Sequence, residues 1–191
     1  MARRWPLLLG LIAGLAALCL GTQAGKDWLE GWQLAARWTA RIGFPIFMIT
    51  YAASSIGRLW PSDFTRAVWR DRRWWGLGFA ACHTVHLYAL YIYTVAAGHG
   101  VSTQTLIGGG GAYVVMYLMA LTSNEAAMRA LGKNWKRLHS LGIHWLWFVF
   151  TISYFGRVAE GREMPFAGLA LAVALAGLGL RIAVWRKTKR A

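Results

Sequence analysis

The apolar run GLGFAACHTVHLYALYIY, residues 76–93, contains His83 and His86 and is nearly as long as a helix that crosses a bilayer. The second such run, WKRLHSLGIHWLWFVF, contains His139 and His144. All 7 carboxylates of the chain fall outside the apolar runs. Ionisable groups inside a bilayer are costly and are usually functional. Histidines on two helices without acidic partners therefore favour a metal or haem clamp over a proton-coupled carrier.

The composition of the chain is typical of a membrane protein. Hydrophobic residues make up 57% of its 191 residues, and the mean hydropathy is +0.39, which is high for a soluble domain of this size. We expect an all-α integral membrane protein, a six-transmembrane-helix bundle that forms a single domain over residues 1–191. The six predicted spans cover about 6–22, 39–58, 74–97, 105–122, 138–156 and 165–185.

Positive charges divide unevenly between the two ends of these spans. Of the 21 lysines and arginines, sixteen fall on one side and five on the other. The positive-inside rule makes the richer side cytoplasmic, with both termini there, in a bacterial-type inner (plasma) membrane. Short basic loops that flank spans bind anionic membrane lipids, so the net charge of +14 does not indicate a nucleic-acid partner.

The first apolar stretch, RRWPLLLGLIAGLAALCLG, has the basic start and apolar run of a signal peptide. We favour a retained span, because six spans satisfy the charge rule. The loops between the spans are too short to hold a nucleotide. A flavin or hydride donor is therefore expected on another chain.

Depth along the helices relates the histidines of the two runs. His83 and His144 each lie about nine residues from the cytoplasmic end of their span, roughly 14 Å deep. His139 lies about 6 Å deep, and His86 shares a helix face with His83. Two imidazoles at one level on neighbouring helices can hold a haem iron from both faces, which suits electron transfer. The alternative is a hydrogen-bonding role between helices, and His99 is expected in an exposed loop.

The chain has no CxxCH attachment motif, so the expected cofactor is non-covalent haem b. One haem is expected rather than two. Along the helix axis, His83 and His86 are only about 4.5 Å apart, and His139 and His144 are about 7.5 Å apart. These separations leave too little room for two macrocycles. Basic side chains just cytoplasmic of the histidines are candidates for binding haem propionates. They are Arg72, Arg73 and Arg137.

An ordered series of short motifs runs through residues 41–157. It consists of Arg72-Arg73, Gly76-Leu77, Phe79, His86-Leu87, Leu121-Thr122-Ser123, Leu131-Gly132, Trp135, Leu138-His139 and Tyr154. In this order the motifs resemble the ferric-reductase-like transmembrane domain family, which includes the haem-binding subunit of the bacterial methionine sulfoxide reductase system. The resemblance implies a six-helix b-type cytochrome with His86 and His139 at ligand-matched positions. The depth argument instead pairs His83 with His144, so both pairings stay open.

These features together predict a haem b-binding membrane electron-transfer protein. It would be the electron-transferring component of a ferric-reductase-like or methionine-sulfoxide-reductase-like oxidoreductase. A separate flavoprotein or quinol would supply electrons on the cytoplasmic side, and an acceptor would receive them on the other side. Two alternatives are a non-enzymatic haem-binding sensor or haem-handling protein, and a small transporter with a histidine-lined pathway.

Overall fold

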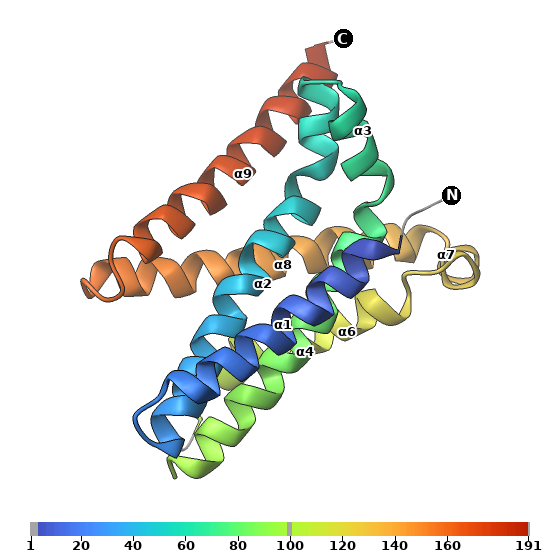
Figure 1. The fold of residues 1–191 in the computed structure, drawn as a ribbon. Helices are drawn as coiled ribbons and strands as arrows, with labels where there is room; N and C mark the ends of the chain where they lie inside the picture. The colour runs from blue at the N-terminus through green and yellow to red at the C-terminus, as the bar shows by residue number, and fades with distance from the viewer. Residues whose placement is uncertain (1–3, 99–100, 191) are drawn as a thin grey trace. The chain divides into compact units, whose positions relative to one another are not determined.

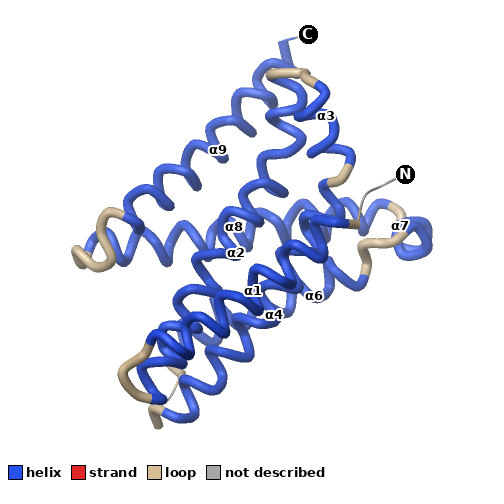
Figure 2. Tube along the Cα trace, in the orientation of Figure 1, coloured by secondary structure: helices blue, strands red, loops and turns tan. Residues whose placement is uncertain are grey.

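The computed structural model describes residues 4–98 and 101–190, and this part of the chain is helical without any strand (Figures 1 and 2). His99 lies outside the described residues. The helices are α1 Trp5–Ala24, α2 Trp28–Leu59, α3 Asp63–Arg70, α4 Arg72–Ala96, α5 Thr103–Thr105, the π-helix Leu106–Gly110, α6 Gly111–Leu121, α7 Glu125–Leu131, α8 Lys133–Ala159 and α9 Phe166–Arg190. The predicted all-α class is confirmed for the described residues.

Each predicted span coincides with helical structure, and the largest difference is at the start of α2. This helix begins at Trp28, about eleven residues before the predicted second span. The side chain of Asp27 accepts a hydrogen bond from the Glu30 amide at 2.8 Å, and the Glu30 carboxylate accepts one from the Lys26 amide at 2.8 Å. The first bond satisfies an amide that a helix start leaves without a partner, and the second ties the preceding residue to the first turn. They explain the early start, and the spacing of Asp27 and Glu30 was already a signal for it.

The helices of the described residues differ in how well they suit a membrane. By length and hydropathy, α1, α2 and α9 can each cross a bilayer. The segment Leu106–Leu121 joined to α7 counts as a fourth span if the pair, bent by 105°, crosses as one. The helices α4 and α8 contain the histidines and many tyrosines and tryptophans, which lower their hydropathy. The structure is thus compatible with a membrane protein, and the count of six spans stays a prediction.

The helices divide into two compact units. The first, Met1–Phe47 with Asp71–Gly110, contains α1, α4 and the first part of α2. The second, Met48–Arg70 with Gly111–Ala191, contains the rest of α2 together with α3 and α6 to α9. The histidines of α4 therefore belong to the first unit and those of α8 to the second. The expectation of a single domain stays a prediction.

Close backbone approach holds α1 against α4 in the first unit, where the two helices lie side by side (Figure 1). A Cβ atom added at Gly10 would meet the backbone of Gly78, and one added at Gly14 would contact Cys82. Small residues let membrane helices pack at short range. This contact fixes α4 along the length that contains its histidines.

The second unit packs α8 between partners on α6 and α9. A Cβ atom added at Gly142 would collide with the side chains of Met119 and Val115 of α6. On the α9 side, the indole N–H of Trp147 donates a hydrogen bond of 2.8 Å to the carbonyl of Ala174. Gly142 lies between His139 and His144, and Trp147 follows His144 by three residues. The two contacts therefore hold the part of α8 that contains its histidines.

Candidate functional site

His83 is buried in the first unit, with 8% of its surface exposed. Its ring lies over Gly43 of α2, where an added Cβ would collide with the imidazole. The ring of Phe79 lies 4.3 Å away between centroids, and Phe47 packs on Phe79 at 5.2 Å. The absence of a side chain at Gly43 thus makes the space that His83 fills.

His86 lies next to His83 on α4, with the two ring centroids 5.2 Å apart. The prediction that these histidines share a helix face is therefore confirmed. Nδ1 of His86 is 3.1 Å from Oγ1 of Thr39, a fully buried residue of α2. The Thr39 hydroxyl already donates its single hydrogen to the carbonyls of Ala35 and Ala36, at 2.7 and 3.0 Å.

The direction of the bond between Thr39 and His86 depends on the tautomer of the ring. When the Thr39 hydrogen goes to a carbonyl of its own helix, Oγ1 accepts and Nδ1 of His86 is the donor. In the neutral imidazole the electron pair then resides on Nε2. A histidine that binds a metal commonly donates its other ring N–H in this way, which fixes the ring and strengthens the ligand.

His139 lies in a cluster formed by α6 and α8 in the second unit. Its Nε2 is 3.0 Å from Oγ1 of Thr122, whose hydroxyl donates to the carbonyl of Leu118 at 2.7 Å. When the Thr122 hydrogen goes to that carbonyl, Nε2 is the donor and the electron pair of His139 resides on Nδ1. The indole of Trp135 stacks on the imidazole at 4.1 Å and donates to the Thr122 carbonyl at 2.9 Å. Three residues of the sequence motifs, Thr122, Trp135 and His139, thus come together.

His144 is oriented by its own helix and by Tyr51 of α2. Nδ1 lies 2.6 Å from the carbonyl of Ser140, which can only accept, so Nδ1 has the hydrogen and Nε2 the electron pair. The Tyr51 ring meets the imidazole edge-on at 5.9 Å and stacks with Trp147 at 6.2 Å. The guanidinium of Arg181 lies 4.6 Å over the Tyr51 ring and donates to the Tyr51 carbonyl at 3.0 Å.

Sequence reasoning did not find this part of the site. Tyr51 is fully buried in the interior of α2, and nothing in its neighbours along the chain distinguishes it from an interface tyrosine. Arg181 did carry a signal, because it interrupts an otherwise apolar run in α9. We interpreted it only as one more cytoplasmic charge.

The three arginines proposed for propionate binding are exposed at the starts of their helices. Arg72 and Arg73 open α4, and the Arg73 guanidinium lies 5.2 Å over the ring of Trp74. Arg137 lies near the start of α8, two residues before His139. Their role toward an anionic group stays a prediction.

The histidines of α4 and α8 could serve as ligands to a metal that needs few protein donors. Within residues 4–98 and 101–190, no three or more His, Cys, Asp or Glu side chains form a group that could hold a bare metal ion. A porphyrin supplies the equatorial nitrogens itself and needs only axial ligands. Imidazoles whose second nitrogen is already hydrogen-bonded, as in His86 and His144, have the chemistry of such ligands. The chain matches no family model, and no solved structure matches it.

Proposed function

We propose that this chain is a haem b-binding electron-transfer protein of the membrane, with axial ligands among the histidines of α4 and α8. The observation that carries the proposal is the hydrogen bonding of the rings. Nδ1 of His86 lies 3.1 Å from Oγ1 of Thr39, and Nδ1 of His144 lies 2.6 Å from the carbonyl of Ser140, so donation from Nδ1 would leave each electron pair on Nε2. Two histidine ligands leave no open iron position, which suits electron transfer rather than oxygen chemistry.

The same bonds favour one ligand on each helix over the other. Donation from Nε2 of His139 to Thr122 would leave its electron pair on Nδ1, the nitrogen nearer its own backbone, whereas the bond of His144 to Ser140 leaves the pair on Nε2 at the outer end of the ring. On α4 the donor bond to Thr39 favours His86. We therefore propose His86 as the ligand of α4 and His144 as the ligand of α8, one member from each pairing that the sequence left open. His83 and His139 would then be packing residues of their own helices.

The wider setting of the proposal follows the sequence. The resemblance to the ferric-reductase-like transmembrane domain family supports a six-span b-type cytochrome in the inner membrane, with both termini cytoplasmic. Electrons would come from a cytoplasmic flavoprotein or quinol and leave to an extracytoplasmic acceptor. Arg72, Arg73 and Arg137 lie at helix starts that the charge rule puts on the cytoplasmic side, where they would bind the haem propionates.

The decisive experiment is a haem measurement on the full chain. Protein extracted in mild detergent from haem-replete cells should give about one haem per chain by pyridine haemochrome, and a low-spin reduced-minus-oxidised spectrum of the b type. Folded protein without haem would refute the proposal and leave the transporter alternative. Haem that cannot be reduced reversibly would favour a haem-binding sensor or haem-handling protein.

The topology has its own test. Reporter fusions after Arg70 and after Gly98 should report opposite sides of the membrane, because the sixteen-to-five division of lysines and arginines puts the first position in the cytoplasm. Equal signals from the two fusions would contradict six spans with cytoplasmic termini.

A further inference from the structure

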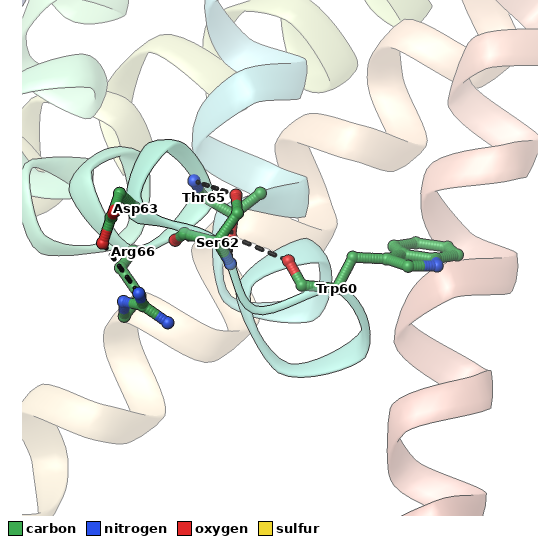
Figure 3. Close-up of polar contacts among 5 residues, drawn as sticks. All are labelled: Trp60, Ser62, Asp63, Thr65 and Arg66. Carbon is green, nitrogen blue, oxygen red and sulfur yellow. Dashed lines mark hydrogen bonds and ion pairs between the residues drawn. The ribbon is translucent and has the colours of Figure 1, made fainter.

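The short helix α3 has a firmly fixed start, shown in Figure 3. The amide of Ser62 donates to Oγ1 of Thr65 at 2.9 Å, and the amide of Thr65 donates to Oγ of Ser62 at 3.1 Å. The Thr65 hydroxyl also donates to the carbonyl of Trp60 at 2.8 Å. The indole of Trp60 points away from the other four labelled residues. The connection from α2 into α3 is therefore a defined turn rather than a loose linker.

Two large apolar side chains at α3 are exposed: Phe64 in its first turn and Trp60 in the turn that precedes it. Phe64 is 77% exposed and Trp60 is 59% exposed, although both are large apolar side chains. Val68 follows Phe64 by four residues, so it lies on the same side of the helix. Trp69 is on another side and packs on Gly57 of α2, with the Arg58 guanidinium 5.5 Å over its ring. The contact between Trp69 and Gly57 holds α3 to α2, and the side chains of Phe64 and Trp60 remain exposed.

Positive charge accompanies this apolar side. From residue 58 to residue 70 there are three arginines and one aspartate, a net charge of 3 − 1 = +2. Arg66 is paired with Asp63 at 2.7 Å, and both side chains are exposed. An amphipathic helix with aromatic residues on one face and basic residues on the other is typical of a segment that lies in a membrane interface.

The position of α3 in the chain restricts where it can lie. It starts four residues after α2 ends at Leu59, and α4 begins two residues after it ends. The three-residue connection from α2 reaches at most about 10 Å. If α2 and α4 both cross the bilayer, as the proposed topology has it, both ends of α3 are held at the membrane surface.

We propose that α3 lies flat in the headgroup region of an anionic phospholipid leaflet, with Trp60 and Phe64 inserted toward the acyl chains and the neighbouring arginines beside lipid phosphates. Tryptophan and phenylalanine gain by leaving water at this depth, and each basic residue near an anionic surface adds attraction. The inference rests on the proposed membrane topology but not on haem. Charge complementarity and the short tethers favour a lipid surface over a partner protein.

The experiment measures the depth of α3 in the full chain. Single cysteines replace Phe64 or Trp60 on the apolar side, and Asp63 on the polar side as the matched control, in a Cys19→Ser background. Cys82 is fully buried and can stay. Each cysteine receives a nitroxide label, and the protein is reconstituted into vesicles of phosphatidylcholine alone or mixed with phosphatidylglycerol. Collision with oxygen and with a water-soluble nickel complex then reports the depth of each label.

We expect the labels at positions 64 and 60 to collide with oxygen rather than nickel, and the label at 63 to show the reverse. The difference should increase with phosphatidylglycerol and shrink at about 1 M salt, where charge is screened within about 3 Å. Nickel accessibility at 64 and 60 equal to that at 63 in both vesicles would overturn the proposal and indicate a surface for a partner protein. If the labels at positions 64 and 60 have the same depth in both kinds of vesicle, the preference for an anionic leaflet would be refuted. A chain without haem that gives the expected depths would refute the proposed function alone.

Discussion

The histidines of α4 and those of α8 are held in different ways. On α4, both depend on α2: His83 fills the space over Gly43, and His86 donates to Thr39. On α8, His144 is bonded to Ser140 one turn earlier in its own helix. The orientation of the α4 rings is therefore set by tertiary packing, whereas the hydrogen bond of His144 is local and only its contact with Tyr51 is tertiary. Substitutions at Thr39 and Gly43 of α2 should disturb the first pair and leave His144 in place.

The largest effects are expected from removing the histidines themselves. His86→Ala and His144→Ala should each abolish haem binding or leave a high-spin species, because no neighbouring nitrogen replaces the lost ligand. His139→Ala should keep the low-spin spectrum and cost about 0.6–2 kcal/mol of stability, as loss of a hydrogen bond between membrane helices does. Absorption spectra of the purified variants make the comparison, with His99→Ala as the control.

These spectra also distinguish the pairings. Loss of the low-spin signal in His139→Ala together with its retention in His144→Ala would restore the pairing that the family resemblance implies. Loss in His83→Ala with retention in His86→Ala would favour the pairing by depth. Wild-type spectra in all four single variants would refute ligation from both helices.

A smaller effect is expected at Gly43. Gly43→Ala places a methyl group where the His83 ring lies, so the ring or α2 must shift. Overpacking of this kind costs about 1–3 kcal/mol. Thermal unfolding in detergent measures it, and Gly156→Ala is the matched control, because a Cβ at Gly156 in α8 meets nothing within 4 Å. The control should be neutral or slightly stabilising, by about 0.5–1 kcal/mol. Equal stability of the two variants would show that the contact between Gly43 and His83 is not tight.

What the sequence predicts well is local. The spacing of His83 and His86 puts them on one face, and the ring contact confirms it. The bond from His144 to Ser140 is also local, since a side chain and the carbonyl four residues earlier are neighbours on any helix. Depth along a helix, in contrast, ignores the hydrogen bonds of the ring: it separates His139 from His144 by level alone, and it pairs His144 with His83 rather than with His86.

What the sequence does not predict is the register between helices. Thr39 is 47 residues from His86, and no periodicity in either segment relates the two. Nothing in the sequence distinguishes Gly43 from other small residues. Its importance is that the His83 ring lies over it, which only the structure shows. The division of the histidines between two units was likewise absent from the prediction, because a run of helices with short loops has no composition change that marks it.

The smallest and most specific effect is expected from two matched threonine substitutions. Thr39→Val and Thr122→Val each remove one hydroxyl from beside a histidine and keep the shape of the side chain. Each leaves a ring N–H without that acceptor, at a cost of about 1–3 kcal/mol where the group is buried. Because Thr39 is fully buried and Thr122 only half-buried, Thr39→Val should be the more destabilised of the two in thermal unfolding. They should differ in what they do to haem.

If His86 is the ligand, the bond to Thr39 increases the electron density that its ring donates to iron, which stabilises the ferric state. Thr39→Val should then raise the midpoint potential of the haem and weaken haem retention by about tenfold or more, while Thr39→Ser, which keeps the hydroxyl, restores both. Thr122→Val should leave the potential at the wild-type value, because His139 is then only a packing residue. Spectroelectrochemical titration of the three variants and the wild type decides the matter. A raised potential in Thr122→Val with no change in Thr39→Val would reverse the assignment and make His139 and His83 the residues to test as ligands.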